Sequence, residues 1–286
     1  MLAAMPEKTQ GVPTSLEERL LAAGVRVDAD PFESWVRLRE AEGERATVID
    51  LYALVAGPRG LEPQELSREE RLDLARRGLA VVWPGFESTA GSERSLEPVQ
   101  IAAYDDEWPR RFTQWHDRLT AALGEQAIRI EHVGSTSVPG LDAKDTVDIQ
   151  VSVDDIGAES SYVPQIEAIG AQLRSRDVLH RYFRPFPGQP REVHVHVCNS
   201  GSDWERDHLL FRDYLRVHGS ARVAYAETKR RAATTWRDDR IGYTEAKSEL
   251  IIELQKAAEA WAADVAWSLG PPGGPTSPSG ETPTVR

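Results

Sequence analysis

The chain has 286 residues, and its 34 lysine and arginine side chains against 46 acidic ones give a formal net charge of −12. This acidic excess argues against broad binding to a nucleic-acid polymer, because such binding needs basic side chains that neutralise phosphates. The single cysteine, Cys198, excludes an intramolecular disulfide and a zinc site built from several cysteines.

The first 13 residues have neither a basic segment nor an apolar stretch, so we expect a flexible leader without a secretory signal. The longest apolar run, from Val48 to Ala56, contains Asp50 and is far shorter than the ~20 residues of a membrane helix. One cysteine also fits a reducing compartment. We therefore expect a cytoplasmic protein that does not bind membranes.

Residues 14–86 are predicted to form a small helical module. Its first helix opens with Thr14-Ser15-Leu16-Glu17, which we interpret as a capping box. Further helices are expected from Asp30, over residues 45–56 and after the cap Ser67. No catalytic motif is visible here, so the module is expected to cover a cleft, recruit a protein partner or mediate dimerisation.

The polar segment 87–97 is predicted to be a linker, and the tail 269–286, rich in proline, glycine and serine, to be disordered. Between them, strands are expected at 98–103, 127–133, 146–153, near 178–184 and at 192–198. Helices are expected at 107–123, 162–170, 204–218, 221–236 and 244–268. This mixture favours an α/β domain over 98–268 with a helical cover at its C-terminal end.

The segment most indicative of chemistry follows the 127–133 strand. Residues 134–137 read Gly-Ser-Thr-Ser, so backbone N–H groups and hydroxyls are available together to hold phosphate oxygens. Lys144 adds a positive charge, and Asp148 lies in the next predicted strand. The alternative is a tight turn whose hydroxyls bond to their own backbone.

The string EHVGSTSVPGLDAKDTVDIQV, residues 131–151, resembles the GrpB family, a group with a nucleotidyltransferase-like fold. Three further stretches match that family in order: Tyr104-Asp105 with Trp108-Pro109; His194-Val195-His196-Val197; and 210–216 with Tyr225, Lys229, Tyr243 and Lys247. The resemblance covers roughly 97–265 and implies a nucleotidyltransferase-like mixed β-sheet with C-terminal helices. GrpB-like domains also occur fused to dephospho-CoA kinase, but no P-loop is present in this sequence.

Active nucleotidyltransferases place two carboxylates on one strand and a third on its neighbour, where they hold Mg²⁺ against substrate phosphates. Here the strand reads Asp148-Ile149-Gln150, and the neighbouring strand offers His194 and His196. Residues i and i+2 share a strand face, so these side chains are expected to converge. Three interpretations remain: a modified metal site, a metal-free enzyme with a histidine base, and a degenerate fold without catalysis.

The leading hypothesis is a nucleotidyltransferase-type enzyme that uses a nucleoside triphosphate to modify or activate a small-molecule acceptor. The expected catalytic residues are Asp148, His194 and His196. The expected ligands of a divalent ion, either Mg²⁺ or a transition metal such as Zn²⁺, are Asp148 and His196. The expected nucleotide and phosphate contacts are Gly134, Ser135, Thr136, Ser137, Lys144, Arg184, Arg212, Lys229 and Lys247. The alternative is a non-catalytic module that binds a nucleotide, another ligand or a protein.

Four other residues carry weaker hypotheses. His132 is expected either to join the cluster or simply to end its strand. Asp145, where the family usually has proline, is expected in a solvated loop; if it curls inward, it partly replaces the missing carboxylate. Arg181 is a further candidate for a phosphate contact. Cys198 shares a strand face with His196, but a lone strand cysteine is usually a small buried hydrophobe.

Overall fold

The computed structural model describes residues 15–26, 30–82, 87–88 and 98–270. The chain divides into two compact units, Met1–Gly78 (unit 1) and Leu79–Arg286 (unit 2). The predicted leader and nearly all of the predicted linker and tail lie outside the described residues. Among the helices of the described part, none is both long enough and apolar enough to cross a membrane.

Unit 1 is helical, as predicted. It contains α1 (Leu16–Ala22), α2 (Pro31–Glu42), α3 (Val48–Ala56) and the first part of α4 (Arg68–Val82), with single 3₁₀ turns at Gly43–Arg45, Gly57–Arg59 and Pro63–Glu65. The capping box of α1 lies one residue later than predicted, because Ser15 pairs with Glu18. Trp35 is fully buried, and its indole donates to the carbonyl of Thr47 at 2.7 Å.

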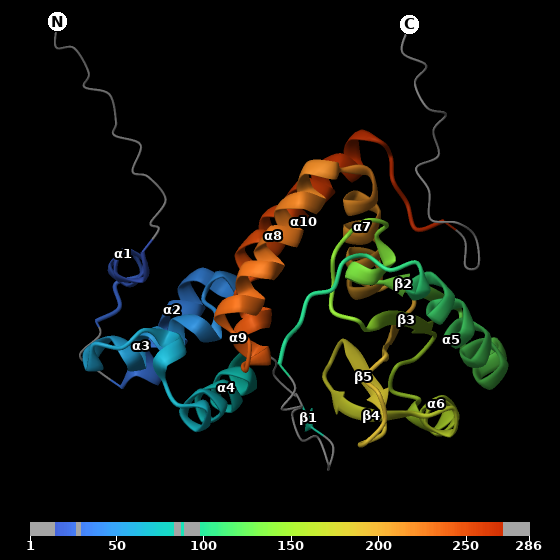
Figure 1. Ribbon diagram of the computed structural model, residues 1–286, viewed down its shortest axis with the longest axis horizontal. Helices are drawn as coiled ribbons and strands as arrows, with labels where there is room; N and C mark the ends of the chain where they lie inside the picture. The colour runs from blue at the N-terminus through green and yellow to red at the C-terminus, as the bar shows by residue number, and fades with distance from the viewer. Residues whose placement is uncertain (1–14, 27–29, 83–86, 89–97, 271–286) are drawn as a thin grey trace, which may run out of the picture. The chain divides into compact units, whose positions relative to one another are not determined.

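Unit 2 is built on one mixed sheet (Figure 1). The six strands are β1 (Glu87–Ser88), β2 (Arg129–Val133), β3 (Val147–Val153), β4 (Ala171–Arg176), β5 (His180–Pro185) and β6 (Val193–Asn199). Their order is β1-β4-β5-β6-β3-β2, and β3 and β6 are the parallel pair. Four predicted strands are confirmed. The predicted strand at 98–103 is wrong, since that segment forms one isolated bridge, between Ala102 and Ala143.

One face of the sheet packs on α5 (Glu107–Leu123) and α6 (Val163–Ala168), which confirm the helices predicted at 107–123 and 162–170. Alternate strand residues supply this apolar core, among them Val147, Ile149, Phe183, Val193 and Val195. The intervening residues therefore point to the opposite face, since successive strand side chains alternate. Short 3₁₀ turns at Gly124–Gln126, Ser135–Ser137 and Glu159–Ser161 connect these elements.

The C-terminal helices are α7 (Asp203–Val217), α8 (Gly219–Thr235), α9 (Arg240–Glu245) and α10 (Ser248–Asp264); α8 and α10 run side by side in Figure 1. Helices α7, α8 and α10 share a second apolar cluster with Val133, Val138 and Leu141. The predicted run 244–268 was wrong as one helix, because a break separates α9 from α10. Unit 2 thus has the predicted nucleotidyltransferase-like mixed sheet with C-terminal helices.

Candidate metal and anion site

The polar face of the sheet carries the predicted cluster. In the parallel ladder Asp148 lies opposite His194, and Gln150 lies opposite His196. Helix α7 covers the Gln150 end, where that amide is fully buried and its Nε2 donates to the carbonyl of Glu205 at 3.5 Å. The Asp148 side chain keeps 30% of its surface exposed. The accessible part of this face is therefore the Asp148 end.

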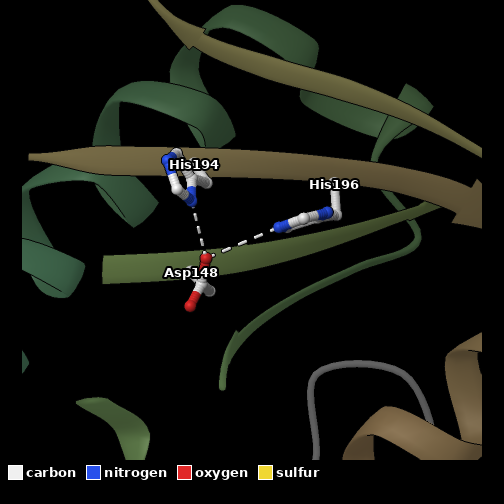
Figure 2. A group of neighbouring side chains, drawn as sticks. All are labelled: Asp148, His194 and His196. Carbon is white, nitrogen blue, oxygen red and sulfur yellow. Dashed lines mark hydrogen bonds and ion pairs between the residues drawn. The ribbon is translucent and has the colours of Figure 1, made fainter. Parts of the chain in front are cut away.

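Asp148 and two histidines form a compact group of potential metal ligands. Nδ1 of His194 lies 3.0 Å and Nε2 of His196 lies 3.5 Å from Oδ1 of Asp148. Figure 2 shows both imidazoles of β6 directed at this one oxygen, while the other carboxylate oxygen points away. One ligand atom from each residue lies within 4.8 Å of the others. The predicted convergence is confirmed, except that Gln150 is held under α7.

The protonation states in this group suit a cation. Burial works against ionisation of Asp148, but hydrogen bonds from His194 and His196 outweigh it and hold the carboxyl pKa well below its usual range. Burial lowers the pKa of His194 to about 4, although Asp148 opposes this shift. At neutral pH the group thus offers a carboxylate and a neutral imidazole, which are the forms that bind metals.

Gly134 lets the turn after β2 approach the cluster. Its φ of +68° is a left-handed conformation, and a Cβ here would lie 2.5 Å from Oδ2 of Asp148. Only glycine combines that φ with this contact at no steric cost. The turn and the carboxylate are thus positioned together.

We expect Gly134→Ala to lower the melting temperature by several degrees and to weaken metal binding, because the methyl group displaces Asp148. Gly140→Ala is the matched control: its φ of +75° gives the same backbone strain, but nothing lies within 4 Å of its Cβ position. Thermal unfolding and metal titration check both variants. Equal metal affinity in the two variants would contradict this role for Gly134.

The turn's three hydroxyls differ in their surroundings. Thr136 and Ser137 are buried; the Thr136 hydroxyl contacts His132 at 3.0 Å, and Ser137 donates to the carbonyl of Gly134 at 2.6 Å. The Ser137 hydroxyl therefore follows the alternative in which the turn bonds to its own backbone, whereas the Thr136 hydroxyl bonds to groups outside the turn. Ser135 is less buried and is hydrogen bonded to Tyr225 of α8. Ser135 is the hydroxyl best placed to meet a ligand.

Three lysines lie near one another beside the cluster: Lys144 and Lys247 interact electrostatically with Asp148, and Lys229 interacts with both of those lysines. Lys144 precedes β3, Lys229 lies on α8, and Lys247 lies between α9 and α10. Lys144 and Lys247 both lie over the Tyr243 ring, 5.1 Å and 4.2 Å from its centroid. Lys229 is 2% exposed and donates to the carbonyl of Asp142.

Burial, reinforced by the neighbouring positive charges, lowers the pKa of Lys247 and of Lys229 to about 7 each. The pKa of Lys144 is lowered for the same two reasons, and Asp148 opposes the shift. Lysines held together in a desolvated site are costly unless an anion compensates them. Their arrangement is what a polyphosphate ligand would require.

Arg212 and Arg181, two predicted phosphate contacts, form ion pairs with acidic side chains of the protein instead. The Arg212 guanidinium is buried against Glu131 and Asp213, each at 2.8 Å, so its contacts are structural. Arg181 pairs with Glu159 at 2.5 Å. Sequence alone could not separate these ion pairs from ligand contacts. Arg184, on β5, lies on the face of the cluster, because it follows by two residues Tyr182, the partner of His196.

The structure also shows the surroundings of His132, Asp145 and Cys198, for which the sequence supports weaker hypotheses. His132 pairs with Ile149 and stacks on Phe112 of α5 with ring centroids 4.8 Å apart, so it faces the apolar core. Asp145 does not curl inward, because Arg111 and Trp108 donate to it at 2.7 Å and 2.9 Å. Cys198 is fully buried, and burial raises its thiol pKa to about 12, which makes it a poor nucleophile.

Sequence reasoning missed the aromatic wall of the site. The Tyr182 ring packs against His194 and His196, with centroids 5.2 Å and 5.3 Å away. Trp204 of α7 packs against His196 at 5.8 Å. Period-two alternation along β5 was the available signal for Tyr182, whereas Trp204 reaches the site only through the packing of α7.

Comparison with known proteins agrees with this fold. The GrpB protein family matches residues 98–257. A UPF0157 protein of Halalkalibacterium halodurans is 40% identical over 164 residues, covering 57% of this chain and 83% of that protein. A dephospho-CoA kinase of Mycobacterium bovis is 27% identical over 260 residues, covering 81% of this chain and 61% of the kinase.

Among solved structures, the conserved protein GrpB from Enterococcus faecalis superposes with a TM-score of 0.51 at 29% sequence identity. The match covers 57% of this chain and 99% of that protein. The family match extends over the strands and helices that carry Asp148, both histidines and all three lysines. This chain belongs to the GrpB protein family.

Proposed function

We propose that this protein is a metal-dependent enzyme that transfers a nucleotidyl group from a nucleoside triphosphate to a small-molecule acceptor. The observation that carries the proposal is the meeting of two kinds of group at one end of the sheet. Asp148 and two histidines form a set of potential metal ligands, Lys144 and Lys247 interact electrostatically with Asp148, and Lys229 lies beside these two lysines. A divalent cation bound to a polyphosphate needs both kinds of group.

The donor set fits a divalent ion held by Asp148, His194 and His196. Imidazole and carboxylate together suit Zn²⁺, Fe²⁺ or Mn²⁺ better than Mg²⁺, which prefers oxygen ligands. Such an ion would act as a Lewis acid toward a phosphate oxygen. The protein's own contribution is to present an ionised carboxylate and two imidazoles from two adjacent strands.

The remaining groups have separate roles in this proposal. Ser135 and the backbone of its turn orient the phosphates, while Lys144 and Lys229 neutralise their charge. The acceptor oxygen bonds to the α-phosphorus as the bond to the bridging oxygen breaks, and pyrophosphate leaves with that electron pair. The acceptor's proton passes to Lys247, whose pKa of about 7 leaves a fraction unprotonated at neutral pH.

A second candidate is a nucleotide-binding module without catalysis. One observation favours it: Gln150 occupies the position of the second carboxylate and is enclosed beneath α7. In a two-metal site the ions stabilise both the attacking and the leaving oxygen. A strand with only one carboxylate has fewer ligands with which to hold two ions. Binding without turnover is the result that would favour this candidate.

Calorimetric titration of ATP, CTP, GTP and UTP, each alone and with Mg²⁺, Mn²⁺ or Zn²⁺, tests the proposal. We expect one nucleotide to bind in a metal-dependent way, and Ser135→Ala to weaken it about tenfold through the lost hydrogen bond. Ser161→Ala, in the turn before α6, is the matched control. If no nucleotide binds under any condition, both the enzyme and the nucleotide-binding module are ruled out.

A further inference from the structure

A cavity of about 500 Å³ lies next to the cluster in unit 2. Lys144 links the two regions, because it lines the cavity and interacts electrostatically with Asp148. The other walls come from the segment before α5, the segment before β6 and the start of α9. This volume is within the usual range for small-molecule sites, and the cavity shares Lys144 with the groups assigned to the phosphates.

The cavity wall has an excess of positive charge. Arg111 and Asp145 form an ion pair, so they neutralise one another. Lys144, Arg191 and Arg240 then line the cavity with a single further carboxylate, that of Glu192. The Glu192 side chain also accepts from the Trp115 indole at 3.4 Å. Three cations against one carboxylate leave a net positive wall.

Arg191 is the residue that points most directly to a ligand. Its Nη1 is buried, and within the described part of the chain it has no hydrogen-bond partner. A buried donor without a partner costs free energy that a bound acceptor restores. Such a group is uncommon in folded proteins unless a ligand, an ion or an ordered water molecule uses it.

The positive region continues across the sheet beyond the cavity. Arg184 of β5 lies on the polar face, since the neighbouring Phe183 belongs to the apolar core, and Arg174 of β4 lies near it, because its charge acts on Arg184. Burial and then the charges of Arg191 and Arg174 lower the pKa of Arg184 to about 10. Like charges gathered in this way favour the binding of a multiply charged anion.

We propose that this cavity binds the acceptor, and that the acceptor is a small molecule carrying a phosphate or carboxylate held by Lys144, Arg191 and Arg240. This inference rests on the proposed function, since it assigns the anion to the acceptor and the triphosphate to the turn at Ser135. A cavity of about 500 Å³ has room for a small molecule. Phosphate and carboxylate ligands both present several acceptor oxygens. Such a group can accept from the donors of the cavity wall, which come from three separate segments.

The test is metal-free calorimetric titration of the full chain with pyrophosphate and, separately, with citrate. We expect one of these probes to bind, and Arg191→Gln and Arg240→Gln each to weaken it at least tenfold. Arg110→Gln, on the exposed surface of α5, controls for the loss of a positive charge. The tighter probe tells whether the site prefers phosphate or carboxylate.

Ser135→Ala separates this inference from the proposed function. It is expected to weaken metal-dependent nucleotide binding while leaving metal-free binding of the anion unchanged. Two results overturn the inference. Either neither probe binds the wild type, or Ser135→Ala weakens binding of the anion while both arginine variants bind it as the wild type does. Failure of every nucleotide to bind, with anion binding still dependent on Arg191, would overturn the proposed function instead. Melting temperatures of all variants check that each one is folded.

Discussion

Replacing Asp148 with asparagine is expected to weaken metal binding by at least about 100-fold, and nucleotide binding in the presence of metal with it. Asp148 is the only carboxylate in the group, and both imidazoles are directed at its Oδ1. Asparagine keeps the shape and one acceptor oxygen but removes the negative charge. The two histidines alone, without a carboxylate, hold a divalent cation poorly.

Titration of Zn²⁺ and Mn²⁺ into the wild type and the variant measures this effect directly. Asp117→Asn is the matched control, because it removes an exposed carboxylate of α5. We expect Asp148→Asn to lose most of its metal affinity and Asp117→Asn to keep the metal affinity of the wild type. Equal Zn²⁺ affinity in all three proteins would mean that the metal, if bound, is held somewhere else.

The cluster could be anticipated because its three residues lie on strands with clear alternation. Val147, Ile149 and Val151 are apolar and alternate with Asp148 and Gln150, so the face of each residue follows from the pattern. The alternation of 193–199 does the same for His194 and His196. What the pattern could not supply is the parallel register that places Asp148 opposite His194, since register depends on the pairing of distant strands.

Other parts of the site depend on tertiary packing. Strand β4 reads Ala-Gln-Leu-Arg-Ser-Arg, and this polar sequence hides both the strand and the place of Arg174 near Arg184. Lys247 reaches the cluster because the chain breaks between α9 and α10, where a single helix was predicted. Gly242 of α9 allows that helix to pack closely on Trp236, since a Cβ there would lie 2.4 Å from the Trp236 ring. Neither feature has a local sequence signal.

The buried lysines predict an unusual pH dependence of stability. For the protein without ligand, we expect the melting temperature of unit 2 to rise between pH 7 and pH 9, on the order of 5 °C or more. In the folded chain Lys229 and Lys247 have pKa values of about 7, against 10.5 when unfolded. Over this range the unfolded state therefore binds more protons, and raising the pH favours the folded state.

The charged groups that act on Lys229 are Lys247, Asp142, Arg230 and Lys144, and those that act on Lys247 are Lys144, Asp148 and Glu245. The pKa of Lys144 is also lowered, so the effect of Lys144 on the pH dependence has the same sign. The tyrosines of the site lower the stability of the folded state as the pH rises, but only at higher pH. Burial raises the pKa of Tyr225 to about 12, so its unfolded form ionises first above pH 10.

Differential scanning calorimetry of the wild type, Lys229→Met and Lys256→Met distinguishes the source of the effect. Lys229→Met keeps the length of the side chain but removes its charge, so it should be more stable than the wild type at pH 7 and should show a flatter pH profile. Lys256 is exposed on α10, and its replacement should leave the profile unchanged. A wild-type profile that is flat or falling from pH 7 to pH 9 would mean that the lysines stay protonated. The same loss of charge is expected to weaken binding of a triphosphate as the pH rises, so stability and affinity should change in opposite directions.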